Sequence, residues 1–265
     1  MLRLVLTAIV AAMAWAMAAP APALASHCLA FVRGTPGIVP VAFTPVQASA
    51  SVDITYVGHS TFRIETPEGV VIATDYAGMA GPGPVPDVVT MNHAHGTHYT
   101  DFPDPAIDHV LRGWNPEGGP ARHDLRVGDV DIRNVPTDIR GVGRTVEPDG
   151  NSIFIFEVAD LCIGHLGHLH HRLSDSDLAL IGRLDIVFAP VDGGLTLDLP
   201  SMIAVLQDLR ASLVIPMHYF GRASLERFLA GMRESFDIRE APGRTITVSL
   251  ETLPERPTVL VPALR

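Results

Sequence analysis

The stretch DVVTMNHAHGTH (residues 87–98) joins a short apolar run to three histidines that lie within six residues. Residues 87–91 predict a buried strand, because a short apolar run next to turn residues is typical of one. In extended backbone His93 and His95 project to the same side, and Gly96 can turn the chain before His98. Imidazole is the commonest side-chain metal ligand, so the stretch predicts a strand that ends in a metal site.

The same pattern follows three later apolar runs. These are 161–163 before His165 and His168, 185–189 before Asp192, and 213–215 before His218. In layered α/β folds, sites gather at the carboxyl ends of strands, so these side chains are expected to share one site. The expected metal ligands are His93, His95, His98, His168 and His218. The alternative is a solvated loop that happens to be rich in histidine, although crowding gives a surface histidine no advantage.

The segment HLGHLHH (residues 165–171) contains the densest group of histidines. Gly167 allows the backbone to approach a site closely, which favours His168 as the ligand. His165 is expected to be a partner of a ligand or an alternative ligand. His170 and His171 are expected to face solvent or to cap the helix that follows.

The chain divides into three parts. Residues 1–25 carry one charge, Arg3, then an apolar run and a small-x-small end, which predicts a signal peptide cleaved before Ser26. A retained anchor is the alternative. Residues 26–52 are expected to form an N-terminal extension, and residues 53–265 one domain with a large core. Cleavage of a leader would place the mature protein in the periplasm or outside the cell.

Charge narrows the choice of partners. The net charge is −10, and all 19 basic residues are arginine. An acidic chain without a basic run is a poor candidate for nucleic acid or, once the leader is removed, for an anionic membrane. The absence of lysine excludes a P-loop and a Schiff base. A small-molecule substrate is the expected partner, and the oligomeric state stays open.

The chain has two cysteines, Cys28 and Cys162. Export would permit a disulfide between them, but two cysteines do not prove one. Cys162 lies in an apolar run, which favours a small buried side chain without a covalent partner.

The order of several motifs resembles the metallo-β-lactamase fold superfamily, in particular its ascorbate-6-phosphate-lactonase-like branch. The matching pieces are ITYVGHSTFRIE (54–65), VVIATDYAG (70–78), HAHGTH (93–98), HLGHLHH (165–171), DIVFAPVDGG (185–194) and IPMHYF (215–220). The resemblance implies an α/β fold, an αββα sandwich in which two mixed β-sheets lie between helices. It also implies one or two metal ions, usually zinc and sometimes manganese or iron.

The sequence departs from the family pattern at three positions. The family motif has an aspartate where this chain has Thr97, and a metal-bridging aspartate where it has His168. A family histidine that usually follows residues 130–135 is missing, and Asp138 is the nearest candidate. Two dications without a bridging carboxylate repel each other strongly, so one tightly held metal or an altered pair is expected. Nitrogen ligands suit Zn²⁺, with Fe²⁺ or Cu²⁺ as alternatives, and Mn²⁺ is a further alternative that the resemblance implies.

These features predict an exported metal-dependent hydrolase that activates water against an ester, lactone, amide or phosphoester. The proton shuttle is expected to be His59 or His165, if uncoordinated, or Asp138. The first alternative is a protein of the same fold that binds a metal or a small molecule without catalysis. The second is a structural domain without metal, which gives no reason to gather histidines at strand ends.

Overall fold

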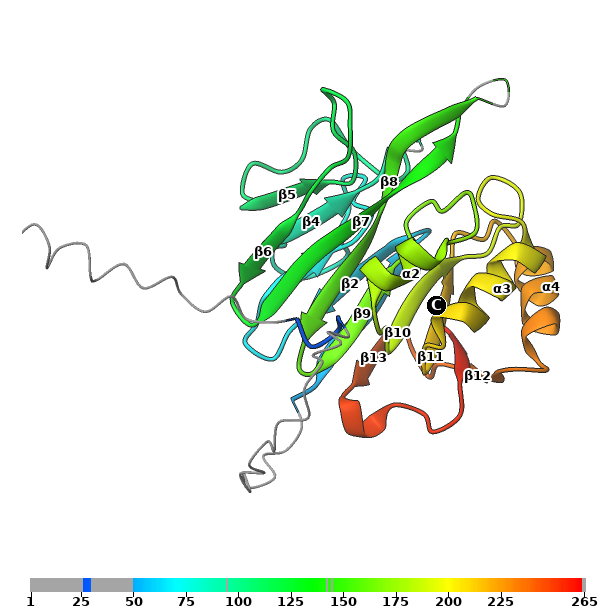
Figure 1. Ribbon diagram of the computed structural model, residues 1–265. Helices are drawn as coiled ribbons and strands as arrows, with labels where there is room; N and C mark the ends of the chain where they lie inside the picture. The colour runs from blue at the N-terminus through cyan, green and yellow to red at the C-terminus, as the bar shows by residue number, and fades with distance from the viewer. Residues whose placement is uncertain (1–25, 30–49, 94, 142, 144, 264–265) are drawn as a thin grey trace, which may run out of the picture.

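The computed structural model describes residues 26–29, 50–93, 95–141, 143 and 145–263 (Figure 1). The expected leader and most of the expected N-terminal extension lie outside these residues. The described chain forms two β-sheets packed face to face, with helices on one outer side. The predicted α/β sandwich of two mixed sheets is therefore confirmed.

The first sheet has six strands in the order β13-β1-β2-β3-β4-β5. It opens with the antiparallel meander β1–β3 and ends with the parallel strands β3, β4 and β5. The bounds are β1 (Val52–Gly58), β2 (Thr61–Glu65), β3 (Val71–Ala73), β4 (Val88–Met91), β5 (His109–Arg112) and β13 (Thr245–Val248). Strand β4 lies in the stretch that the sequence marks as the start of the site.

The second sheet has eight strands in the order β12-β14-β11-β10-β9-β8-β7-β6. Its centre is parallel, from β9 through β10 to β11, and its far edge is the antiparallel set β6–β8. The bounds are β6 (Asp124–Val127), β7 (Val130–Arg140), β8 (Val146–Val158), β9 (Leu161–His165), β10 (Ile186–Pro190), β11 (Leu213–Met217), β12 (Asp237–Glu240) and β14 (Thr258–Val261). The three parallel strands at the centre all end at the same edge, where the predicted ligands follow.

The described α-helices are α2 (Asp175–Ile181), α3 (Leu199–Leu209) and α4 (Arg222–Met232), and a short 3₁₀ helix η2 (Leu250–Thr252) precedes β14. Helix α2 begins with a capping box, in which Ser174 and Asp177 exchange hydrogen bonds. All three α-helices place apolar side chains in the same core, which packs against the second sheet. Figure 1 shows the three helices next to this sheet. None of the described helices is long and apolar enough to span a membrane.

Strand β8 shows how the core is built. Successive side chains of a strand point to opposite faces, and here Ile153 and Ile155 pack toward the helices while Phe154 and Phe156 pack toward the first sheet. Because both faces are buried here, the segment 153–156 of the strand is apolar without alternation. Other residues of the same core, such as Phe188 of β10, also lie between the two sheets.

The resemblance to the family predicts helices on the outer faces of both sheets, and the first sheet differs from this prediction. Among the described residues no helix covers it, and loops do so instead. Tyr99 and Trp114, both on loops, pack against Val89 and Met91 of β4. The edge strands β5 and β6 of the two sheets were not predicted from the sequence, because both are short, partly buried strands within a stretch rich in proline, glycine and charge.

The two cysteines form a disulfide, Cys28–Cys162, across 134 residues of sequence. The expectation that Cys162 is buried is correct, but the expectation that it has no covalent partner is wrong. Cys162 lies on β9, and the carbonyl of Cys28 accepts a hydrogen bond from the amide of Arg183 at 2.8 Å. The disulfide therefore fastens the segment 26–29 to the second sheet, whose central strands carry the site.

Replacement of both cysteines, Cys28→Ala with Cys162→Ala, should lower the free energy of unfolding by about 2–5 kcal/mol, because the unfolded chain loses a long cross-link. Denaturation with urea, with the unsubstituted protein measured before and after reduction, provides the test. Equal stability of the oxidised, reduced and doubly substituted proteins would show that the cross-link carries no stability.

Candidate metal centre

Four histidines from separate parts of the chain converge at the sheet edge. One ring nitrogen from each lies within 4.8 Å of those of the others, and three of the four side chains are buried. The four are His95, His98, His168 and His218. The first two follow β4 of the first sheet, whereas the others follow β9 and β11 of the second sheet. The site is therefore built across the interface of the two sheets.

A buried carboxylate holds His98 in place. The Nδ1 atom of His98 donates to an oxygen of Asp75 at 2.7 Å, and Asn92 donates to the other oxygen at 2.8 Å. Asp75 and His98 are fully buried. Burial by itself raises the pKa of the Asp75 carboxyl, but the facing His98 and His165 outweigh it and lower that pKa to about 2. The carboxylate therefore stays charged and directs Nε2 of His98 toward the cluster.

A second carboxylate does the same for His218. The Nδ1 atom of His218 donates to Asp192 at 3.0 Å. Asp192 also accepts hydrogen bonds from the Thr196 hydroxyl and from backbone amides that include that of Gly194. Burial raises the pKa of the Asp192 carboxyl, but the bonds from His218 and Thr196 lower it further than burial raises it. Asp192, like Asp75, is a carboxylate that orients a metal-ligating imidazole.

Both Nε2 atoms that these carboxylates direct lie buried without a hydrogen-bond partner among the described residues. A buried polar atom without a partner costs free energy, so such atoms are rare and call for an explanation. In a neutral imidazole whose proton is on Nδ1, Nε2 carries a free lone pair, which is the form that binds a metal. The donor set of the cluster fits a transition metal.

Thr97, at the position of the missing family aspartate, connects two histidines. Its hydroxyl lies 2.8 Å from Nδ1 of His95 and 3.0 Å from Nε2 of His59. The ring of His59 lies 4.3 Å from that of His218, between centroids. Burial, with the neighbouring His218 and His98, lowers the pKa of His59 to about 4. The expected proton shuttle His59 therefore borders the cluster as an uncharged imidazole at neutral pH.

The backbone around the cluster adopts conformations that few residues tolerate. His59 and His218 have φ of 52° and 53°, in the left-handed region, and the amide of His218 donates to the carbonyl of His59 at 2.9 Å. Gly167 has φ of 60°, and a Cβ there would lie 2.3 Å from the side chain of Asn151. The expectation that this glycine permits close approach agrees with the structure. Such strain at a site is offset by the surrounding packing.

His168 is held by a residue that was expected to face solvent. The Nδ1 atom of His168 lies 2.5 Å from Nε2 of His170, and the backbone amide of Arg140 donates to Nδ1 of His170 at 2.5 Å. The prediction for His170 was wrong, because the β7–β8 hairpin reaches over HLGHLHH and supplies this amide. His171 bonds only the carbonyl of Arg172 among the described contacts.

Three of the predicted site residues lie elsewhere. His93 bonds Glu147 at 2.8 Å and stacks on Trp114, so its ring is turned out of the cluster. Both nitrogens of the buried His165 are used by the backbone, since Nε2 donates to the carbonyl of Ser60 and Nδ1 accepts from the amide of Gly167. The structure thus makes His165 a link between the two sheets, with no nitrogen left for a proton shuttle.

Asp138 is the third of these residues. Its carboxylate accepts from the amide of Asp149 at 3.0 Å, at a break in the register of β7 and β8. It therefore shapes the β7–β8 hairpin and does not replace the family histidine.

Asp75 is a functional residue that the sequence did not single out. It lies just after β3, far from any histidine in the sequence, so spacing gives no reason to connect it with His98. Its one signal is its place in the motif VVIATDYAG, at residues 70–78.

An open groove of about 420 Å³ lies beside the cluster and is lined in part by His59 and Thr97, which contact the cluster histidines. Ala77 and the 75 % exposed Met79 also line it. Phe220, which is 68 % exposed, lies 5.5 Å from His59 between ring centroids. The approach to the cluster is therefore bordered by apolar side chains.

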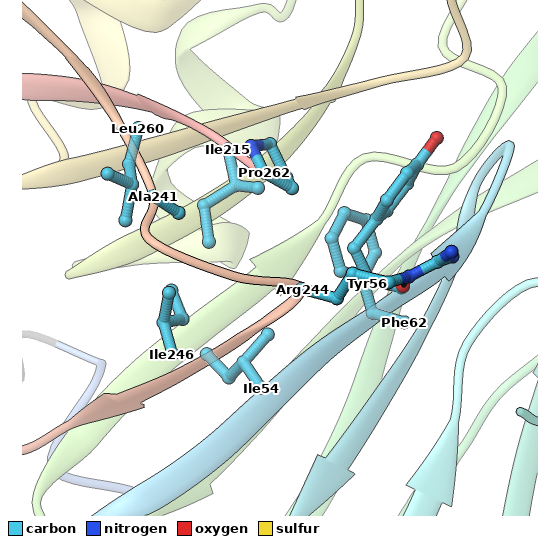
Figure 2. A pocket seen from close by; sticks show the side chains of 9 residues that line it. All are labelled: Ile54, Tyr56, Phe62, Ile215, Ala241, Arg244, Ile246, Leu260 and Pro262. Atoms are coloured by element: carbon cyan, nitrogen blue, oxygen red, sulfur yellow. Dashed lines mark hydrogen bonds between the residues drawn. The ribbon is translucent and has the colours of Figure 1, made fainter. Parts of the chain in front are cut away.

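A separate, much smaller cavity is lined by nine side chains that include Tyr56 and Arg244 (Figure 2). Its volume is about 10 Å³, which is room for one water at most. Arg244 donates to the carbonyl of Tyr56 at 2.9 Å, and the Tyr56 hydroxyl donates to the carbonyl of His59 at 3.4 Å. The residues of this cavity have a structural role beside the site.

Substitution of Asp75 by asparagine should weaken zinc binding by about 10- to 100-fold, which is the usual cost of losing a residue that orients a ligand. Competition with a chromogenic chelator measures this affinity. The exposed Asp108→Asn is the matched control and should bind zinc as the unsubstituted protein does. Unchanged affinity in Asp75→Asn, with the fold intact by circular dichroism, would contradict the role given to the carboxylate.

Acid should destabilise the metal-free protein between about pH 6.5 and pH 4. His59 and His170 have pKa values of about 4 when folded, against a reference value of 6.5. In this window the unfolded chain binds protons that the folded protein does not, so stability falls as the pH falls. The midpoint of urea denaturation, measured with a chelator present, should decrease over this range. The decrease should be smaller in a variant with both His59→Ala and His170→Ala.

Comparison with known proteins places the chain in a family. A family model described as the beta-lactamase superfamily domain matches residues 53–218. A metal-dependent hydrolase of Methanosphaerula palustris is 26 % identical over 217 residues, which cover 76 % of this chain and 96 % of that protein.

Solved structures agree with this placement. A protein of Thermotoga maritima, assigned to the Zn-dependent hydrolases of the metallo-beta-lactamase superfamily, has a TM-score of 0.58 and 27 % identity over 79 % of this chain and 97 % of its own. The diiron beta-hydroxylase CmlA of Streptomyces venezuelae has a TM-score of 0.51 and 12 % identity over 78 % of this chain and 55 % of its own, which shows the fold alone. The chain belongs to the metallo-β-lactamase superfamily.

Proposed function

We propose that the protein is an exported metal-dependent hydrolase that cleaves an ester, lactone, amide or phosphoester with water. The observation that carries this proposal is the pair of buried Nε2 atoms, on His98 and His218, that carboxylates direct into the cluster without a protein partner among the described residues. The likeness to relatives named metal-dependent hydrolases supports the same interpretation.

A metal ion held by the cluster would lower the pKa of water toward ~7 and polarise the bond to be cleaved. Zinc suits the nitrogen-rich donor set best, and Fe²⁺ and Mn²⁺ are the alternatives. The protein contributes orientation through Asp75 and Asp192, which hold two imidazoles in fixed directions. His59 is uncharged at neutral pH because of its lowered pKa, so its ring can accept a proton in the groove.

The groove favours a substrate with an uncharged or apolar group beside the reacting bond. Its described lining contains Val57, Ala77 and Met79 and no arginine or carboxylate. A phosphoester needs a cation to offset its charge, and the nearby Arg140 is occupied by the carbonyls of residues 194–196. Esters, lactones and amides therefore fit this approach better than phosphoesters do.

Export is proposed on two features. The first is the leader-like composition of residues 1–25, with one charge and a long apolar run. The second is the Cys28–Cys162 disulfide, since disulfides persist in oxidising compartments and are rare in the cytosol. Both features point to the periplasm or the cell exterior.

The second candidate is a protein that binds a metal or a small molecule without catalysis. It is favoured by the loss of both family carboxylates, at Thr97 and His168, because a site without them holds less negative charge. The two functions predict the same metal content and differ only in turnover.

The test is turnover on a panel of lactones, carboxylic esters, amides and phosphodiesters after loading with zinc. Hydrolysis of an uncharged acyl substrate is expected, with activity lost on chelation and restored by zinc. His98→Ala should lower kcat/KM by at least about 100-fold, because a metal ligand is lost. His109→Ala on β5, outside the cluster, is the matched control. Zinc binding without turnover on any class would favour the second candidate.

A further inference from the structure

We infer that only three of the four clustered histidines, His95, His98 and His218, bind the metal, and that His168 presents an N–H group to the same centre as a hydrogen-bond donor. This assignment deepens the proposed function and rests on it for the identity of the bound group. What distinguishes His168 from the other three is the direction of the hydrogen bond at Nδ1, the ring nitrogen that points away from the cluster.

A neutral imidazole carries one N–H group and one nitrogen with a free lone pair, and only the lone pair can bind a metal. The partner of one nitrogen therefore decides what the other nitrogen offers. A partner that can only accept forces the proton onto the near nitrogen and leaves the far nitrogen free. A partner that can only donate does the reverse.

His98 and His218 have partners that accept. Their Nδ1 atoms face the carboxylates of Asp75 and Asp192 at 2.7 and 3.0 Å. Both rings therefore carry the proton on Nδ1 and offer the lone pair of Nε2 to the cluster. The lack of a protein partner for these two buried Nε2 atoms, within the described part of the chain, agrees with this assignment.

At His168 the hydrogen bond runs the other way, because Nδ1 of this ring accepts a hydrogen bond instead of donating one. A backbone N–H can only donate, so the amide of Arg140, 2.5 Å from Nδ1 of His170, requires a lone pair there. The proton of His170 is then on Nε2, which lies 2.5 Å from Nδ1 of His168 and donates to it. The proton of His168 must therefore be on Nε2, the atom that faces the cluster.

From His168 onward, each group donates to the next one in the series His95, Thr97 and His59. Nε2 of His168 lies 3.1 Å from Nε2 of His95 and donates to its one lone pair, which therefore faces the cluster. When that lone pair binds a metal, the N–H of His168 is released to another acceptor. Nδ1 of His95 then donates to the Thr97 hydroxyl at 2.8 Å, and that hydroxyl donates to His59 at 3.0 Å. Among the described contacts in the series from Arg140 to His59, none opposes this direction.

Three nitrogen ligands and one open position are the arrangement of a catalytic zinc site, whereas four protein ligands close a structural site. A fixed N–H beside the open position can donate to a substrate oxygen as negative charge develops on it. His168 would thus replace the bridging carboxylate of the family by a neutral donor. His170 is a positioning residue, since it acts only through His168.

The direct test counts metal-bound nitrogens in the unsubstituted full-length protein. With ring-¹⁵N histidine and ¹¹³Cd²⁺ in place of zinc, three histidines should show coupling between ¹¹³Cd and Nε2. The zinc-loaded protein should show a protonated Nε2 on His168. Coupling to four histidines, or coupling that includes His168, overturns the inference. This measurement needs no substitution and no activity.

Substitutions give a second, independent test. His168→Ala should keep zinc affinity within about tenfold, whereas His98→Ala should lose at least about 100-fold, because orienting and donating groups matter less to affinity than ligands do. Any hydrolysis should fall by about 100- to 1,000-fold in His168→Ala, the usual cost of losing one oxyanion donor. Equal loss of zinc in both variants overturns the inference.

The two proposals fail in different ways. If the unsubstituted protein binds zinc through His95, His98 and His218 but cleaves no substrate, the proposed hydrolase is wrong and the assignment of His168 stands. If it hydrolyses a substrate and His168 couples to ¹¹³Cd, the hydrolase stands and the assignment of His168 is wrong.

Discussion

The site depends on two buried hydrogen bonds between a carboxylate and an imidazole, Asp75–His98 and Asp192–His218. Each bond stabilises the charged form of a buried carboxylate. It also fixes the proton of the histidine on Nδ1, which points away from the cluster. The result is a pair of buried nitrogens with free lone pairs and no protein partner among the described residues. Such an arrangement costs free energy in the empty protein, and that free energy is recovered when a cation binds.

The sandwich supplies the rigidity that these bonds need. One carboxylate follows β3 of the first sheet and the other follows β10 of the second, so the two sheets must keep a fixed spacing for the lone pairs to meet. Stacking of Phe62 on Phe188, at 4.1 Å between ring centroids, joins the sheets below the site. His165 bonds the carbonyl of Ser60 from the opposite sheet and contributes to the same spacing. A histidine that resembled a catalytic residue thus acts as part of the frame.

The two departures from the family motif have local compensations. Thr97 cannot supply negative charge, but its hydroxyl links His95 to His59 and so orients both rings. His168 cannot bridge two cations, but the neighbouring His170 and the amide of Arg140 hold it in one orientation. These contacts explain why a nitrogen-rich cluster can persist where the family pattern has carboxylates, and they favour a single metal over a bridged pair.

The sequence alone determined the strands that lead into the site, and the family, because apolar runs that end in histidine or aspartate recur in a specific order. It also singled out His95, His98, His168 and His218, which spacing places after strand ends. Only the tertiary structure decided that His93 turns toward Trp114, that Asp138 serves a hairpin and that Cys28 pairs with Cys162. Spacing along the chain tells which residues can reach a strand end, whereas the direction of a ring is set by partners from distant segments, such as Asp75 and Arg140, that no local pattern reveals.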